Sequence, residues 1–135
     1  MFTTEEFTGH KELSKEILHI DPHIRFVGLI NSRGRLTAGS VRENTVLKVK
    51  PNECEMLYME AVLKMRMHQE FDHCLGPVNF CMSHRKNFII TKFPFGKVLV
   101  YVSADNTFDF TKTPFKIMEI LNKRLEKTSQ IIHSE

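Results

Sequence analysis

Hydrophobic and polar positions divide the chain into stretches with helical spacing and stretches that alternate as strands do. The first helical stretch is marked by Leu13, Ile17 and Ile20. Asp21-Pro22 ends it, because the residue before a proline disfavours helix. Ile24–Asn31 then has apolar residues on both alternating faces, which predicts a central strand covered on two sides. We expect Ile24, Phe26, Gly28 and Ile30 on one face, and Val27 and Leu29 on the other.

A turn over 31–34, with Gly34 suited to positive φ, leads into a second strand from about Arg35 to Ser40. Its glycine and polar residues favour an edge position, and 41–50 is predicted to be a loop. Pro51-Asn52 opens the strongest helix, which we expect to run to about Phe71. Its predicted core stripe is Cys54, Leu57, Tyr58, Ala61, Val62 and Met65.

Three strand-like runs follow, at Val78–Ser83, Phe88–Phe93 and Lys97–Ser103, and the short turns between them predict a meander. Thr113-Pro114 begins a last helix. The order of elements, with a strand covered on two sides at 24–31, predicts a three-layer α/β (α+β) sandwich. We expect a single domain over residues 1–125 and a frayed C-terminal tail over 126–135.

This order of elements resembles the roadblock and profilin-like fold. The resemblance implies a five-stranded antiparallel sheet sandwiched between a middle helix and two terminal helices. Four stretches also resemble a small uncharacterised family from ammonia-oxidising archaea: 24–31, 65–67, 75–80 and 99–105. The archaeal resemblance implies no activity. The roadblock resemblance implies a fold whose members are typically dimeric scaffolds or regulators of small GTPases.

Composition and charge are those of an ordinary globular domain with a net charge of +3, too small by itself to indicate a nucleic-acid partner. No apolar run approaches the ~20 residues that a membrane span needs. The N-terminus lacks the apolar segment of a signal peptide, and three cysteines, an odd number, argue against a disulfide framework. We therefore expect a cytoplasmic protein without a membrane association.

No catalytic or cofactor motif stands out, so we predict a protein that is not an enzyme and holds no cofactor. Three histidines and two cysteines in the middle of the chain lack zinc-site spacing, and whether they ever converge stays open: His68, His73, Cys74, Cys81 and His84. We predict no metal site, and core packing as the role of Cys54 rather than nucleophilic catalysis.

Two surface features are candidates for binding. Arg33, Arg35 and Arg42 lie in a basic stretch that would suit a small anion or an acidic protein, although a solvated loop explains it too. The same stretch lacks aromatic residues, so base stacking is not supported and nucleic acid is disfavoured. The middle helix carries four further large apolar residues, which predict a homodimer interface: Met56, Met59, Leu63 and Met67. The alternative is that the loop over 41–50 and the turn Pro94–Gly96 cover this surface.

These observations favour a non-enzymatic regulatory or protein-interaction module that forms a homodimer through the middle helix. The alternative is a small-molecule or anion sensor with an internal pocket like that of PAS-like domains.

Overall fold

The computed structural model describes the backbone of residues 4–43, 45 and 51–133 and the side chains of residues 9–43, 45 and 52–126. In chain order, the helices and strands are α1 (Thr4–Leu18), β1 (Ile24–Ile30), β2 (Leu36–Val41), α2 (Pro51–Gln69), α3 (Asp72–Leu75), β3 (Cys81–His84), β4 (Phe88–Phe95), β5 (Val98–Asp105) and α4 (Thr113–His133). α4 thus continues as helix through residues 126–133, for which we expected a tail.

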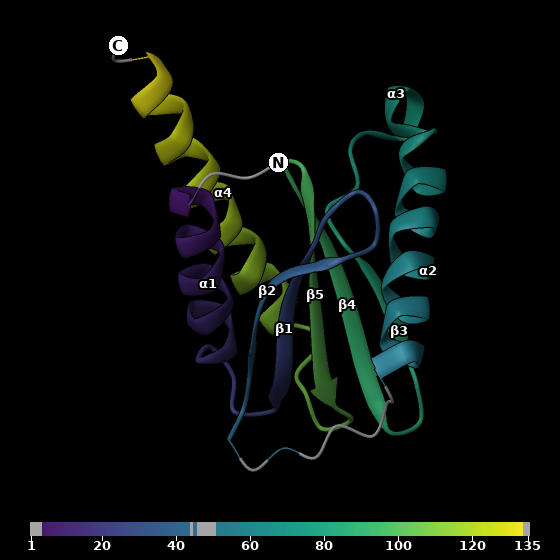
Figure 1. The fold of residues 1–135 in the computed structure, drawn as a ribbon. Helices are drawn as coiled ribbons and strands as arrows, with labels where there is room; N and C mark the ends of the chain where they lie inside the picture. Colours follow the sequence, from purple (N-terminus) through teal and green to yellow (C-terminus); the bar gives the residue numbers. More distant parts are fainter. Residues whose placement is uncertain (1–3, 44, 46–50, 134–135) are drawn as a thin grey trace.

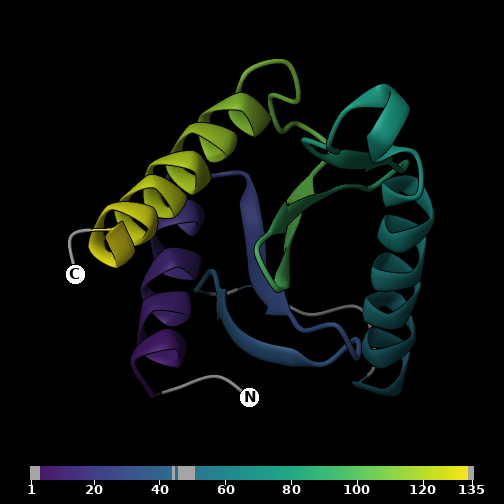
Figure 2. The ribbon, with the colours of Figure 1, turned by 90° about the horizontal axis from the view of Figure 1, so that it is seen from above.

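The strands form one antiparallel sheet in the order β2-β1-β5-β4-β3. α2 covers one face of the sheet, and α1 and α4 cover the other (Figures 1 and 2). This arrangement confirms the three-layer sandwich predicted from the order of elements. It also places β2 at an edge, as its polar sequence indicated.

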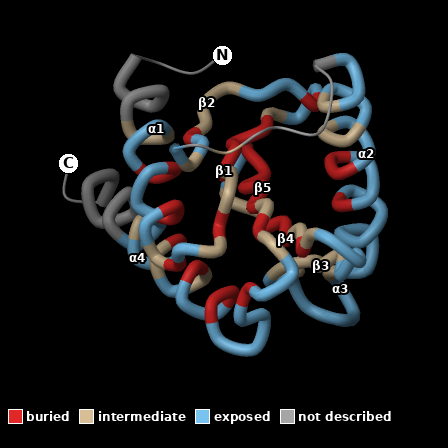
Figure 3. The backbone as a smooth tube through the Cα atoms, turned by 90° about the horizontal axis from the view of Figure 1, so that it is seen from below, coloured by how far each residue is buried: buried red, intermediate tan, exposed pale blue. Residues whose placement is uncertain are grey.

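Two apolar cores form, one on each face of the sheet (Figure 3). The larger core joins the sheet to α1 and α4 and includes Leu13, Val27 and Phe93. The smaller core joins the sheet to α2 and includes Ile30 and Met65. β1 and β5 lie in the middle of the sheet and supply residues to both cores, which explains their near-continuous apolar sequences.

The predicted alternation of β1 is wrong at Ile24. Ile24 is fully buried in the core below α1 and α4, whereas Phe26 packs against the core below α2. The register between β1 and β5 shifts between these two residues, where Ile24 pairs with Ala104 and Phe26 pairs with Ser103. Such a bulge adds one residue to a strand, and every side chain before it therefore points to the opposite face.

The strands of the meander also differ in length from the prediction. β3 begins only at Cys81. Val78 packs against the smaller core and Phe80 against the larger one, so these two residues do not share a face as they would in a strand. β4 continues through Pro94, which pairs with Leu99 of β5. β3 pairs with β4 only as far as Lys92, so the missing amide of Pro94 costs no strand hydrogen bond.

Candidate interaction surface

α2 carries apolar side chains on two opposite faces. The inward face contains Ala61, Val62 and Met65, which are 2–6% exposed. Helical periodicity turns the outward residues away from the sheet, where large fractions of their side chains reach solvent: Met56 is 72% exposed, Met59 41%, Leu63 48% and Met67 68%. We call these four residues the methionine face. A helix that is apolar on both sides is normally buried on both, so this face is a candidate surface for contact with a partner.

Aromatic contacts fix the inward side of α2 on the sheet. Tyr58 meets Tyr101 of β5 edge to face, with ring centroids 5.4 Å apart. Burial, with a smaller contribution from Cys54, raises the pKa of Tyr58 to about 12, so its hydroxyl stays neutral at physiological pH. The orientation of the methionine face is therefore set by packing behind it.

The turn between β1 and β2 lies against the methionine face. Gly34 is buried with φ of 78°, and a Cβ at this position would lie 3.1 Å from the Cα of Met59. Arg66 of α2 donates a hydrogen bond to the carbonyl of Ser32 in the same turn. The exposed Arg33 and Arg35 on either side of Gly34 are consequently placed beside the methionine face.

Arg42 lies apart from the other two arginines, at the opposite end of β2. The six residues of β2 separate them by roughly 20 Å, at ~3.3 Å per residue. Its guanidinium donates to the carbonyls of Ile24, at 2.6 Å, Asp21, at 3.0 Å, and Leu18. The structure thus places Arg33 and Arg35 beside the methionine face, whereas the guanidinium of Arg42 binds backbone carbonyls at the end of α1 and before β1.

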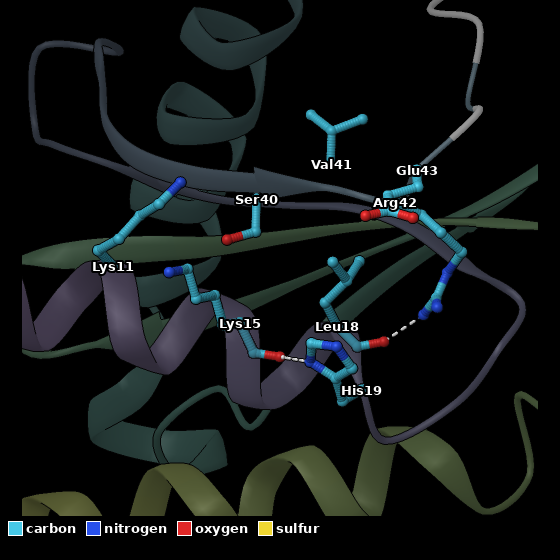
Figure 4. Close-up of a pocket in the computed structure, with 8 residues that line it drawn as sticks. All are labelled: Lys11, Lys15, Leu18, His19, Ser40, Val41, Arg42 and Glu43. Atoms are coloured by element: carbon cyan, nitrogen blue, oxygen red, sulfur yellow. Dashed lines mark hydrogen bonds between the residues drawn. The ribbon is translucent and has the colours of Figure 1, made fainter.

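A surface hollow of about 580 Å³ lies between α1 and β2 next to Arg42 (Figure 4). Its lining is basic, but Lys11 donates to the carbonyl of Gly39 and His19 Nδ1 donates to that of Lys15, at 2.6 Å. Lys11 and Arg42 therefore attach β2 to α1, whereas the hydrogen bond of His19 stays within the α1 segment. The hollow lies at the surface rather than within either core, unlike the internal pocket that the sensor alternative invoked.

The thiols and imidazoles of the middle of the chain do not form a cluster. Over the part of the chain that the structure describes, no three His, Cys, Asp or Glu side chains are grouped so that they could hold a metal ion. His68 and Cys81 line one small hollow on the α2 side of the sheet. His84 points to the other side, where its ring packs edge to face on Phe110.

Sequence reasoning missed two exposed apolar residues past the end of α2. Phe71 is 57% exposed and Leu75 is 81% exposed. Their spacing at intervals of four residues after Met67 was the available signal, although a turn at residues 70–71 separates α2 from α3. No helix in the described ranges has the length and apolar content that a membrane span requires.

Comparison with solved structures identifies the fold. MglB, described as a gliding protein, from Thermus thermophilus superimposes with a TM-score of 0.70 and 16% identity over 94% of this chain and 95% of that chain. Myxococcus xanthus MglB gives 0.68 and 15% over 94% and 95%. A Roadblock/LC7 domain from Streptomyces avermitilis gives 0.66 and 13% over 89% and 97%. At these identities the likeness shows a shared fold.

No curated protein sequence matches the chain significantly. The profile of a family of unknown function, DUF6659, matches residues 6–130, which is almost the whole chain. The sandwich of helices and sheet is therefore a roadblock/LC7-type fold, and the chain belongs to the DUF6659 family.

Proposed function

We propose that this protein is a non-enzymatic regulatory module that acts through protein contacts and forms a homodimer through the methionine face. The observation that carries the proposal is the two-sided apolar character of α2, with one side packed on the sheet and the other exposed. Burying such side chains against a partner contributes roughly 25 cal/mol per Å² of apolar surface. Methionine adapts its shape to a facing surface, which suits an interface.

A second copy of α2 is the occupant that fits this face. If two α2 helices pack antiparallel about a two-fold axis near the middle of the row, Met56 of each lies opposite Met67 of the other. The same axis places each Glu60 beside the Lys64 of the second copy. Within one copy these two residues form an ion pair of 3.3 Å along the flank of the face, so the charges are self-complementary.

The proposed self-association has support from one of the similar solved structures. One of the similar structures is described as MglB with a tetrameric arrangement, at a TM-score of 0.69 and 16% identity. That assembly is a property of MglB, and here it supports self-association as one use of the fold. The cytoplasmic and archaeal setting expected from the sequence stays a prediction.

Arg33 and Arg35 add a further element to the proposal. They lie at the rim of the methionine face, where interfaces normally carry their charged residues. We propose that they select an acidic protein surface for binding to the dimer. Arg42 is not part of this rim, because its donors are bonded to backbone carbonyls.

The homodimer is tested by light scattering coupled to size exclusion over micromolar concentrations. We expect a mass of twice the 15.8 kDa of one chain. Leu63→Glu should shift the mass to that of one chain, because it places a charge at the centre of the interface. Circular dichroism should show an unchanged fold, since Leu63 is 48% exposed.

Leu125→Glu is the matched control, because Leu125 is also a helical leucine and is 42% exposed, but on α4. This variant should retain the dimer mass. A single-chain mass for the unchanged protein at every concentration would reject the homodimer, and so would a dimer that survives Leu63→Glu.

A further inference from the structure

Lys92 is a buried charged residue in the middle of the sheet. It lies on β4 directly opposite Cys81 of β3, and its side chain is on the α2 side. The residue is only 8% exposed. Lysine is almost never buried to this extent without a partner, so its surroundings need an explanation.

The ammonium group of Lys92 has few acceptors around it. Its Nζ lies 3.4 Å from Ser83 Oγ, which is its one hydrogen bond to a residue of the described ranges, and no described carboxylate is within ion-pair distance. Burial lowers the pKa of Lys92 most, and the positive charges of Lys64 and Arg85 add to the lowering, whereas Cys81 and Glu60 act in the opposite direction. The ammonium group has three hydrogens to donate, and Ser83 is its one hydrogen-bond partner among the described residues.

A hollow of about 150 Å³ opens beside Lys92, between α2 and β3. This volume corresponds to roughly five water molecules and is smaller than the ~300 Å³ of the smallest drug-sized sites. Its polar lining consists of side chains that can donate a hydrogen bond: Lys64, His68, Cys81, Ser83 and Lys92. No Asp or Glu is among its lining residues in the described ranges.

We propose that this hollow binds a small oxyanion the size of inorganic phosphate. The oxygens accept hydrogen bonds from Lys92 Nζ and Ser83 Oγ, and Lys64 supplies a second positive charge from α2. An oxyanion offers acceptors on all sides, which matches a lining of donors. The hollow next to Arg42 differs in this respect, because three of its basic side chains already donate to backbone carbonyls.

The proposed oxyanion site is separate from the methionine face. Lys64 and His68 lie on the flank of α2 that turns toward β3, whereas Met56 and Met67 are largely exposed to solvent and Met59 lies beside the turn between β1 and β2. Lys64 lies at the border between the two, because it lines the hollow and also forms the ion pair with Glu60 on the flank of the methionine face. The site would give the domain a second property, a response to small anions.

The proposal is tested by titrating the ¹⁵N-labelled protein with inorganic phosphate and following amide shifts by NMR. Acetate is titrated in parallel to distinguish a carboxylate from a tetrahedral anion, with sodium chloride at matched ionic strength as the reference. We expect saturable shifts with phosphate at residues 61–68, 81–84 and 90–93. Shifts equal to those in sodium chloride would overturn the proposal.

Lys92→Met removes the charge and retains an apolar chain of similar length. It should weaken phosphate binding at least ten-fold and should not destabilise the protein, because it removes a buried charge. Lys86→Met, on the exposed turn between β3 and β4, is the matched control and should change the affinity less than two-fold. Equal affinities for the two variants would overturn the proposal.

A direct measurement covers the case in which Lys92→Met does not fold. The Cε and Nζ signals of Lys92 in the unchanged protein report its protonation across a pH titration. Bound phosphate should raise the pKa of Lys92 relative to sodium chloride, because a neighbouring anion stabilises the ammonium. An unchanged midpoint would reject contact between the anion and Lys92.

Discussion

Arg42 shows how a single side chain can attach a strand to a helix. Its guanidinium reaches back from the end of β2 to the last turn of α1 and to the loop before β1. The carbonyls at a helix C-terminus have no partners within the helix, and a cation there also interacts favourably with the helix dipole. Arg42 therefore supplies donors where the backbone lacks them, and its role is in the fold.

Replacing Arg42 should destabilise the protein. Arg42→Met keeps the apolar stem but removes the donors to three carbonyls, so we expect a loss of about 2–3 kcal/mol in the free energy of unfolding. Arg33→Met, in the exposed turn, should change this free energy by less than ~0.5 kcal/mol. Urea unfolding followed by circular dichroism measures both. Equal losses would show that the carbonyl contacts of Arg42 do not contribute to stability.

At the scale of residues, the sequence located the charged side chains but did not indicate which contacts they make. Arg42 was grouped with Arg33 and Arg35 because they are close in the chain, yet a six-residue strand lies between them. Lys92 was assigned correctly to a strand, but a charged residue next to Phe93 gave no sign that α2 would cover it. Both outcomes depend on contacts between distant segments, which periodicity does not contain.

At the scale of elements, the turn between β1 and β2 supports α2. Gly34 is the point of contact, and its positive φ allows the backbone to approach Met59 without a side chain between them. Because Met59 itself belongs to the methionine face, the position of this turn affects how that face is oriented. The turn and the helix therefore act as one unit in the proposed interface.

Gly34→Ala should be costly for two reasons. The positive φ costs about 1–2 kcal/mol for a residue with a Cβ, and the new methyl group would lie 3.0 Å from Met59 Cε and 3.1 Å from its Cα, which adds an overpacking cost of about 1–3 kcal/mol. Gly96→Ala is the control, because it also has a positive φ, of 57°, but open space around it. Urea unfolding should show the larger loss for Gly34→Ala. Losses of equal size would mean that the turn does not rest on α2.

The elements themselves were predicted well because their signals are local. Strand alternation, the glycine turn and the proline-bounded helices indicated the five strands and the three long helices in the right order. The structure adds the short helix α3 and otherwise changes mainly the ends of the elements. The exception is Ile24, whose face is reversed by the bulge before Phe26. A bulge depends on pairing with β5, about 80 residues later in the chain, so the pattern around Ile24 cannot reveal it.

At the scale of the whole molecule, polar contacts connect the elements on the side of the sheet that α1 and α4 cover. Asp21 accepts a buried hydrogen bond of 2.9 Å from Thr113 at the start of α4. Asp105, at the end of β5, meets Arg25 at 3.0 Å and His23 at 3.2 Å. These contacts join the loop after the first helix to the last strand and the last helix. The opposite side of the molecule ends in the methionine face, which is where we place the partner.

Asp105 should make the free energy of unfolding depend on pH in the acid range. Burial alone would raise the pKa of its carboxyl, but hydrogen bonds from Thr107, His23 and Arg25 outweigh burial and lower the pKa to about 2. A carboxyl with a lowered pKa stabilises the fold above its unfolded pKa of 3.8, and this contribution is lost as the pH falls toward 2. With the carboxylate 24% exposed, we expect about 1–2 kcal/mol at neutral pH.

Asp105→Asn should therefore lower the free energy of unfolding at pH 7 by about this amount and approach the unchanged protein near pH 2. Asp109→Asn is the control with the same change in net charge. Asp109 accepts the same pair of hydrogen bonds from Thr111, at 3.0 and 2.6 Å, on the exposed surface. Its variant should show the smaller dependence on pH. If urea unfolding at several pH values gave parallel curves for Asp105→Asn and the unchanged protein, Asp105 would not be the carboxylate that ties the first strand to the last.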